Sequence, residues 1–195
     1  DGFADGSIPL PLVLRSAEAA ERALSLLAQS QERADTTGGV VILATVKGDL
    51  HDIGKNLAGL ILAGAGYRVV DLGVDAGVAD ILQAARQEAA MAIGLSGLLM
   101  RSLSEMEAVA GALADAGCSA LLLLGGAAVD KSYVDKRIEP LYPGRVMACA
   151  DAFEAIRFLD RVDKSQRKNQ TSSIPPRAVP KHGGRRQLDG QRSST

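Results

Sequence analysis

From Val40 to about residue 161 the chain alternates between short apolar runs and longer segments in which apolar residues recur at helical spacing. The clearest run, VVILA at 40–44, is continuously apolar, which is typical of a strand buried on both faces. This alternation predicts βαβ units and therefore a parallel sheet covered by helices. The strands are predicted near 40–46, 68–72, 92–95, 120–124 and 146–149. The helices are predicted near 53–65, 78–89, 102–116, 130–140 and 151–161.

This order of elements favours one α/β architecture. Strands with intervening helices suit a flavodoxin-like (Rossmann-like), doubly wound, five-stranded parallel sheet with right-handed crossovers. A complete Rossmann fold would need a sixth strand, which the sequence does not contain. We assign this α/β domain to residues 38–162.

Two segments of different character flank the α/β domain. Residues 1–37 hold one helical pattern at 11–29 and a polar linker, and a single helix must bury its apolar face against something else. Residues 163–195 lose all periodicity and are rich in basic residues, Ser, Gln, Pro and Gly, which predicts a disordered basic tail. Because the sequence begins at Asp1 rather than at Met, we expect it to be a piece of a longer protein.

Composition argues against several classes of partner. The formal net charge of -1 gives no general reason to expect nucleic acid, and no aromatic residues interleave the basic tail to stack on bases. No apolar run is long enough to span a bilayer, and no signal peptide is visible. Cys118 and Cys149 lack zinc-type spacing and are expected to be reduced. We therefore expect a cytoplasmic protein that binds neither nucleic acid nor membrane.

The loop after the first predicted strand contains the best candidate for a metal ligand. Its residues are Gly48, Asp49, Leu50, His51, Asp52, Ile53 and Gly54. An imidazole can bind a metal through one nitrogen while its other N–H donates to a carboxylate, here that of Asp49. Gly54 would let a bulky ligand approach the backbone closely. Taken alone, the same residues more often form an exposed loop histidine beside an Asp52 helix cap.

Two further loops should lie at the same edge of the sheet, because they also follow strands. They contain Ser96, Gly97 and Leu98 after the third strand, and Gly125, Gly126 and Ala127 after the fourth. Small residues there could leave a slot that reaches into the domain. Tight packing of helix against sheet is the alternative explanation.

Together, the three loops resemble the cobalamin-binding signature of methionine synthases and related corrinoid proteins. The family pattern is Asp-x-His-x-x-Gly, then Ser-x-Leu, then Gly-Gly. The matching residues are Asp49, His51, Gly54, Ser96, Leu98, Gly125 and Gly126. The stretches VVDLG at 69–73 and DAFE at 151–154 are also similar, so that the resemblance covers residues 3–160.

The resemblance implies a cobalamin cofactor, as methylcobalamin, whose dimethylbenzimidazole leaves cobalt and inserts into the domain. In this base-off mode His51 would be the lower cobalt ligand, and Asp49 and Ser102 would continue a hydrogen-bonded chain from it. Ser102 could also serve as a helix N-cap. The slot for the nucleotide tail would be lined by Ser96, Leu98, Gly125 and Gly126.

The N-terminal residues resemble the last part of the helical cap of methionine synthase. In that family the cap covers the upper face of the corrin ring, and Phe3 and Leu10 occupy matching positions. Residues 1–37 would then be the remnant of such a cap and its linker.

The implied function is to carry a methyl group on cobalt, from methyltetrahydrofolate to homocysteine. A folate-binding barrel alone would need about 250 residues, so we expect the chain not to be catalytic by itself. Its partners would be homocysteine-, folate- and reactivation-type domains. A free-standing corrinoid methyl carrier or a cobalamin-sensing regulator remains an alternative. An adenosylcobalamin mutase domain is disfavoured by Leu50 and Ile53, where mutases usually have Gly and Arg.

Overall fold

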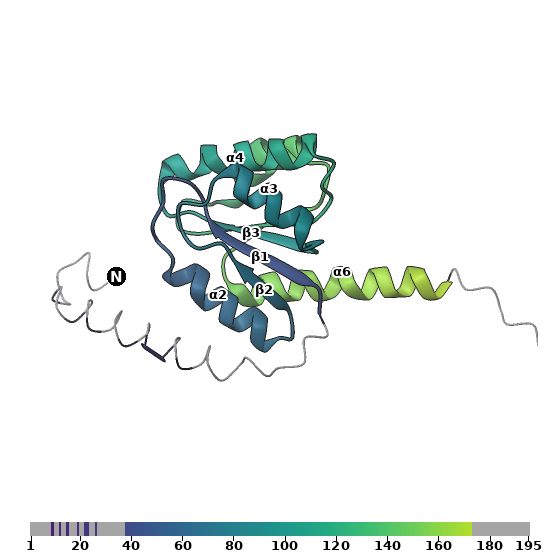
Figure 1. Ribbon diagram of the computed structural model, residues 1–195, viewed down its shortest axis with the longest axis horizontal. Helices are drawn as coiled ribbons and strands as arrows, with labels where there is room; N and C mark the ends of the chain where they lie inside the picture. Colours follow the sequence, from purple (N-terminus) through teal and green to yellow (C-terminus); the bar gives the residue numbers. More distant parts are fainter. Residues whose placement is uncertain are drawn as a thin grey trace, which may run out of the picture. The chain divides into compact units, whose positions relative to one another are not determined.

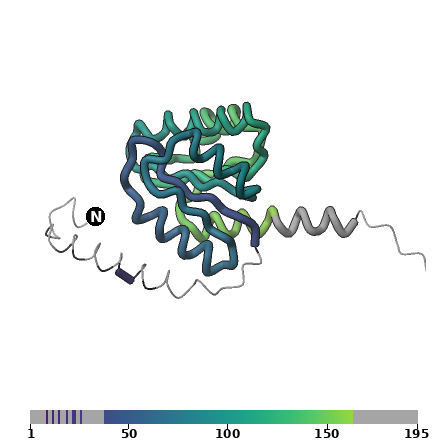
Figure 2. Tube along the Cα trace, viewed as in Figure 1, coloured from purple at the N-terminus to yellow at the C-terminus, as the bar shows by residue number. Residues whose placement is uncertain are grey.

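The computed structural model describes residues 38–172, with side chains as far as Val162, and a few residues nearer the N-terminus (Figure 2). Those few are Pro9, Leu12, Arg15, Ala19, Arg22, Ala23 and Leu26. All but Pro9 are helical, in agreement with the helix expected at 11–29. Phe3 and Leu10, the candidates for the upper face of a corrin, lie outside the described residues.

The centre of the domain is a five-stranded parallel sheet with the order β2-β1-β3-β4-β5 (Figure 1). The strands are β1 (Val40–Thr45), β2 (Arg68–Asp71), β3 (Ala92–Ser96), β4 (Leu121–Gly125) and β5 (Val146–Cys149). This is the flavodoxin-like order, so the predicted fold class is confirmed. The order reverses between β1 and β3, and ligands of such sheets bind where the order reverses.

Helices cover both faces of the sheet. On one face lie α3 (Val78–Gln87) and α4 (Met100–Asp115); on the other lie α2 (Ile53–Gly64) and the first part of α6 (Figure 1). The larger apolar core lies under α3 and α4, where strand residues such as Ile42 and Leu122 pack with Met106. None of the described helices is long and apolar enough to cross a membrane.

The structure departs from the predicted helices in two places. The segment predicted as one helix near 130–140 is α5 (Lys131–Tyr133), then a π-helical turn (Val134–Ile138) and a 3-10 turn (Glu139–Leu141). Pro140 lies in that last turn and has no N–H for a continuing α-helix.

The helix α6 (Ala152–Ser172) continues well past the predicted end near 161. Its backbone therefore continues into the segment from 163 that was assigned to a disordered basic tail, as far as Ser172. This part is rich in Lys, Arg and Gln, which form helices readily but leave no apolar stripe for a periodicity argument.

Candidate functional site

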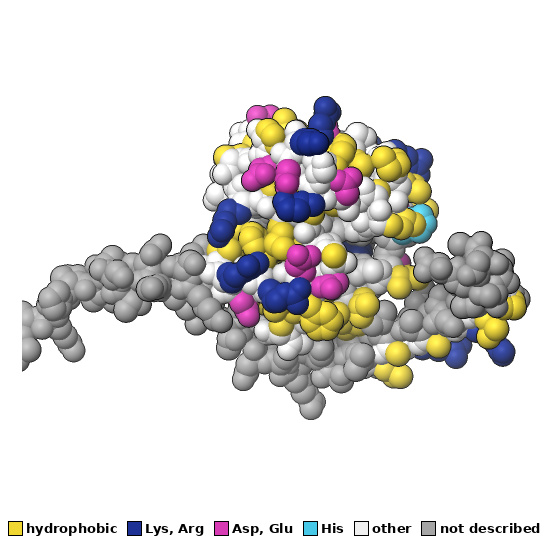
Figure 3. Space-filling model, turned by 180° about the vertical axis from the view of Figure 1, so that it is seen from behind, with side chains coloured by type: hydrophobic (Ala, Val, Ile, Leu, Met, Phe, Trp, Pro, Cys, Tyr) yellow, Lys and Arg dark blue, Asp and Glu magenta, His cyan; other side chains and the backbone are white. Residues whose placement is uncertain are grey.

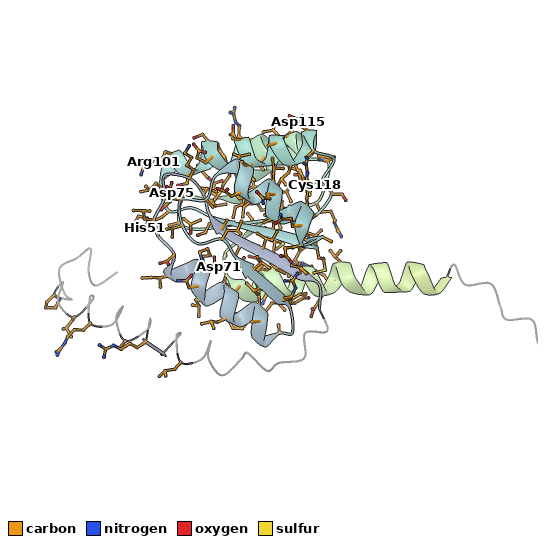
Figure 4. The ribbon with its side chains drawn as sticks, in the orientation of Figure 1. His51, Asp71, Asp75, Arg101, Asp115 and Cys118 are labelled. Atoms are coloured by element: carbon orange, nitrogen blue, oxygen red, sulfur yellow. The ribbon has the colours of Figure 1, made fainter. Side chains whose placement is uncertain are left out.

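The loops that follow β1, β2 and β3 meet at the carboxyl edge of the sheet. Figure 4 shows His51, Asp75 and Arg101, one from each of these connections, at the same edge. The strand ends are held in register here, since Thr45 pairs with Ser96 and Ser96 with Gly125. The three candidate loops were expected at one edge, and the loops after β1 and β3 converge on a single carboxylate, that of Asp49.

The Asp49 carboxylate accepts five hydrogen bonds. Oδ1 accepts from the backbone N–H of His51 at 3.1 Å and from the ring Nδ1 of His51 at 2.6 Å. Oδ2 accepts from the hydroxyl of Ser102 at 2.7 Å and from the amides of Leu98 at 2.7 Å and Leu99 at 3.2 Å. Asp49 and Ser102 are both fully buried. One side chain therefore fixes the histidine loop to the β3–α4 loop and to α4.

These donors determine the protonation state of Asp49. Burial by itself raises the pKa of this carboxyl, but the hydrogen bonds from Ser102, His51 and Leu98 outweigh burial and hold the pKa well below its usual value. Asp49 is therefore a carboxylate at neutral pH. Because a carboxylate can only accept, the proton of the His51–Asp49 bond lies on Nδ1 of the histidine.

This ionisation predicts a specific sensitivity to acid. A group whose pKa is lower in the folded state contributes stability that is complete above the pKa of the unfolded chain, near 3.9 for Asp, and that is lost as the pH falls below it. We expect the free energy of unfolding of the wild type to fall between pH 5 and pH 3 by about 1 kcal/mol more than that of Asp49→Asn. Urea titrations at both pH values measure this difference, and equal losses would contradict it.

His51 presents its other nitrogen outward. Its side chain is 55% exposed, although the Asp49 carboxylate that it contacts is 0% exposed. With Nδ1 protonated, Nε2 carries the free lone pair, and within the described residues nothing hydrogen-bonds to it. The buried Thr45 hydroxyl donates to the His51 carbonyl at 3.2 Å, which fixes the backbone as well as the ring. The arrangement is that of a preoriented metal ligand.

Two residues that the sequence analysis did not single out hold the start of this loop. The Gly48 N–H donates to Asp75 Oδ1 at 2.7 Å, and the Gly48 carbonyl accepts from the Arg101 guanidinium at 2.5 Å. Gly48 has a φ of 77°, and Asp75, at 53°, is a non-glycine residue in the left-handed region. Asp75 and Arg101 are far from Gly48 in the sequence and approach it only in the folded chain, so sequence spacing could not predict these contacts.

Exposed apolar side chains stand on the same loops. Three of them were predicted from the motif, namely Leu50 (70% exposed), Ile53 (45%) and Leu98 (42%). Two were not, namely Val74 (37%) and Met100 (75%). Figure 3 shows hydrophobic side chains beside the histidine at this edge. An apolar rim around an outward imidazole suits a ligand with a broad apolar face.

A cavity of about 230 Å³ lies between the sheet, α2 and the start of α6. Its wall includes Gly54, Ser96, Gly125 and Gly126 among the predicted residues. Further lining comes from Leu43, Lys55, Ala58, Leu62, Gly94, Leu123, Cys149, Asp151 and Ala155. The predicted slot therefore exists, on the face of the sheet that α2 and α6 cover.

Gly97, Leu98 and Ala127 were also predicted for the site but are not among the residues that line the cavity. Gly97 instead lies against α4, because a Cβ there would be 2.5 Å from Cβ of Ser102. Leu98 contributes its amide to Asp49. Gly97 and Leu98 therefore shape the histidine loop rather than the cavity.

Of the two residues considered as helix caps, Ser102 and Asp52, only Asp52 lies at an N-cap position. Leu99 is the N-cap of α4, and Ser102 lies in the first turn of the helix with its hydroxyl on Asp49, so the N-cap interpretation of Ser102 was wrong. Asp52 does occupy the N-cap position of α2, but its carboxylate accepts from the side chain of Asn56 at 3.0 Å.

Comparison with known proteins identifies the family. The model of the B12 binding domain matches residues 39–143. The chain belongs to the B12-binding domain family. It is 38% identical over 181 residues to the methionine synthase of Mycobacterium tuberculosis and 36% identical over 185 residues to that of Mycobacterium leprae. Each match covers 91% of this chain but 15% of the relative, so the chain spans about one seventh of these methionine synthases.

Solved structures of corrinoid proteins share the B12-binding fold. The monomethylamine corrinoid protein of Methanosarcina barkeri is 25% identical with a TM-score of 0.67, over 83% of this chain and 76% of that one. The methanol:cobalamin methyltransferase complex of the same organism is 26% identical with a TM-score of 0.60, over 83% of this chain and 60% of that one. A cobalamin-binding protein of Desulfitobacterium hafniense is 26% identical with a TM-score of 0.58, over 82% and 74%. The predicted resemblance and the predicted cobalamin cofactor are confirmed.

The residues of this B12-binding domain fit a corrinoid. Among the described residues, no three His, Cys, Asp or Glu side chains form a group that could hold a bare metal ion. A corrin already supplies most of the ligands of its cobalt, so one outward imidazole is sufficient at the protein side. The apolar rim and the adjoining cavity are two separate surfaces next to the histidine loop.

Proposed function

We propose that this domain binds cobalamin base-off, with His51 as the lower ligand of cobalt, within a methionine synthase-type methyl transfer from methyltetrahydrofolate to homocysteine. The observation that carries the proposal is the bond of 2.6 Å from His51 Nδ1 to Asp49, which leaves Nε2 free on a loop whose Gly54 lines a cavity of about 230 Å³. Bound cobalamin supplies a cobalt centre that can carry a methyl group between a donor and an acceptor.

The residues of the chain have distinct roles in this proposal. Asp49 fixes the tautomer and direction of His51, and Ser102 holds Asp49 in place. The protonation state therefore belongs to His51, Asp49 and Ser102 together and not to one of them alone. Gly54 leaves room for the corrin, because a Cβ there would meet nothing within 4 Å. Leu50, Ile53 and Leu98 present apolar surface to the ring.

We propose that the domain does not turn over by itself. The described residues offer no zinc-type cluster to activate a thiol, and the matching methionine synthases are much longer. Homocysteine-, folate- and reactivation-type domains would therefore be its partners. Phe3 and Leu10 of this chain would cover the upper face of the corrin ring. A free-standing corrinoid methyl carrier is the second candidate, favoured by the likeness to the corrinoid proteins of Methanosarcina barkeri.

The test is the EPR spectrum of the cobalt(II) form of the cobalamin-loaded domain, with protein labelled at histidine with nitrogen-15. Coordination by His51 should change the nitrogen hyperfine pattern on labelling, because the coupled nitrogen then belongs to the protein. A pattern unaffected by labelling would place the cofactor's own base on cobalt and refute the proposal.

A matched pair of glycine variants tests the role of Gly54. Gly54 and Gly111 both lie in helices, α2 and α4, with open space at the Cβ position, but only Gly54 is among the residues that line the cavity. Alanine should stabilise each helix by about 0.5–1 kcal/mol in urea unfolding. We expect Gly54→Ala to weaken cobalamin binding by about tenfold, a cost of about 1.4 kcal/mol, and Gly111→Ala to leave it unchanged. Equal affinities of the two variants in a spectroscopic titration would show that Gly54 does not approach the cofactor.

A further inference from the structure

The cavity beside the histidine loop differs in polarity between its mouth and its inner wall. Ser96, Gly125 and Cys149 pair across the strands at the carboxyl edge and form the mouth. One step deeper on the same face, Leu43, Gly94 and Leu123 pair in the same way. Leu95 and Leu124 also line the cavity from β3 and β4, and Ala58, Leu62 and Ala155 line it from the helices. Among the described lining residues, the inner wall is therefore apolar.

The two charged residues of the cavity are engaged elsewhere. The Lys55 ammonium, whose side chain is 2% exposed, donates to both oxygens of Asp71 at 2.5 Å and to Asn56 Oδ1 at 2.8 Å, which uses its three N–H groups. Asp151 accepts the N–H of Glu154 at 2.7 Å at the start of α6. Lys55 therefore has no free N–H for a ligand, and Asp151, an exposed residue two positions after Cys149 of the mouth, does not belong to the inner wall.

The backbone of the inner wall is engaged as well. Gly94 lies in the centre of the sheet, with strand neighbours on both sides, so its N–H and C=O are oriented along the sheet towards those strands. A polar ligand atom that is buried here loses its hydrogen bonds to water and gains none from the protein, which weakens binding.

We propose that this inner wall selects the chemical class of the base at the end of the cofactor's nucleotide tail, favouring a benzimidazole over a purine. The inference rests on the proposed function, which seats that tail in the cavity. Dimethylbenzimidazole and adenine are both fused two-ring bases of similar size, so the cavity distinguishes them by polarity and not by volume. Adenine adds further ring nitrogens and an amino group, and each buried group without a partner weakens binding about fivefold or more.

The experiment compares the dissociation constants of cobalamin and of the cobamide with an adenine tail, with tail-less cobinamide as the reference. The two bases leave cobalt with different ease in solution. The decisive quantity is therefore the ratio of the dissociation constant of cobalamin to that of the adenine cobamide, compared between wild type and variants. The cost of detaching each base from cobalt is a property of the ligand, so it cancels in this comparison.

The variants place a polar group on the inner wall. Leu123→Asn supplies a donor and an acceptor, and Ala58→Ser, a smaller change in α2, is the second variant in case the first does not fold. Ala112→Ser is the matched control, since Ala112 is half-buried in a helix as Ala58 is but does not line the cavity. We expect either cavity variant to shift the ratio about three- to tenfold towards the adenine cobamide, and the control to leave it unchanged.

The outcomes separate this inference from the function on which it rests. If cobalamin binds more tightly than cobinamide but neither cavity variant shifts the ratio, the tail is seated and the inference on base class is overturned. If cobalamin and cobinamide bind equally tightly to the wild type, the tail is not seated in the cavity, and the base-off proposal fails together with the inference.

Discussion

Asp49→Asn is expected to abolish nitrogen coordination from His51 although the histidine itself is unchanged. All five contacts of the carboxylate are with donors, so an amide must turn its NH2 towards some of them. The NH2 faces His51, because Nδ1 can become an acceptor when the ring proton moves to Nε2, whereas the amides of Leu98 and Leu99 can only donate. The nitrogen that points outward then has no lone pair for cobalt. Loss of the histidine hyperfine pattern in the EPR spectrum measures this result.

The same variant should unfold more easily. At least one buried donor loses its acceptor, and we expect a loss on the order of 3 kcal/mol in the free energy of unfolding. Asp75→Asn is the matched control, because within the described residues the Asp75 carboxylate accepts one hydrogen bond, from the backbone N–H of Gly48, and an amide oxygen can replace it. Histidine coordination that survives in Asp49→Asn would show that Asp49 does not determine the tautomer.

Gly126→Ala is expected to destabilise the domain by about 3 kcal/mol or more, while Gly125→Ala changes stability by less than about 0.5 kcal/mol. At Gly126 a Cβ would lie 2.1 Å from the carbonyl oxygen of Gly97, and φ is 119°. At Gly125 the nearest heavy atom to a Cβ would be the Cys149 carbonyl oxygen at 3.6 Å, an ordinary contact. Urea unfolding of the two variants measures the difference.

The Gly126 variant should also weaken cobalamin and cobinamide alike. Moving Gly97 displaces the neighbouring amides of Leu98 and Leu99, which hold Asp49. Gly126 therefore supports the histidine loop as well as lining the cavity. A variant that keeps wild-type stability and loses affinity for cobalamin alone would assign Gly126 to the cavity wall only.

The strand positions could be predicted closely because a strand buried in a parallel sheet is recognisable from its own run of apolar residues. The β1 run is apolar throughout, and the structure places it at Val40–Thr45 against a prediction near 40–46. Helix ends were harder, since they depend on contacts and capping. Helix α4 was predicted to begin near 102 but starts at Met100, and this shift moves Ser102 from the cap into the first turn.

At the site, the motif residues were predictable but their supports were not. Asp49 and His51 are two residues apart, so their contact can be anticipated from spacing. Asp75 reaches Gly48 across 27 residues and Lys55 reaches Asp71 across 16, and such pairs leave no local pattern. The exposed Val74 and Met100 were missed for a related reason, because apolar residues next to a motif are usually assigned to the core.

The spread of the Asp49 contacts along the chain has a consequence for how the domain folds. Its partners Leu98 and Ser102 lie 49 and 53 residues further on, beyond β2 and α3. Contacts at such separations carry a large loop-closure entropy and form slowly. During synthesis, a nascent chain that ends before β3 already contains His51 but lacks the groups that fix Asp49. The hydrogen bonds that hold Asp49 therefore form only once β3 and α4 have joined β1, so the proposed ligand geometry of His51 is completed late in folding.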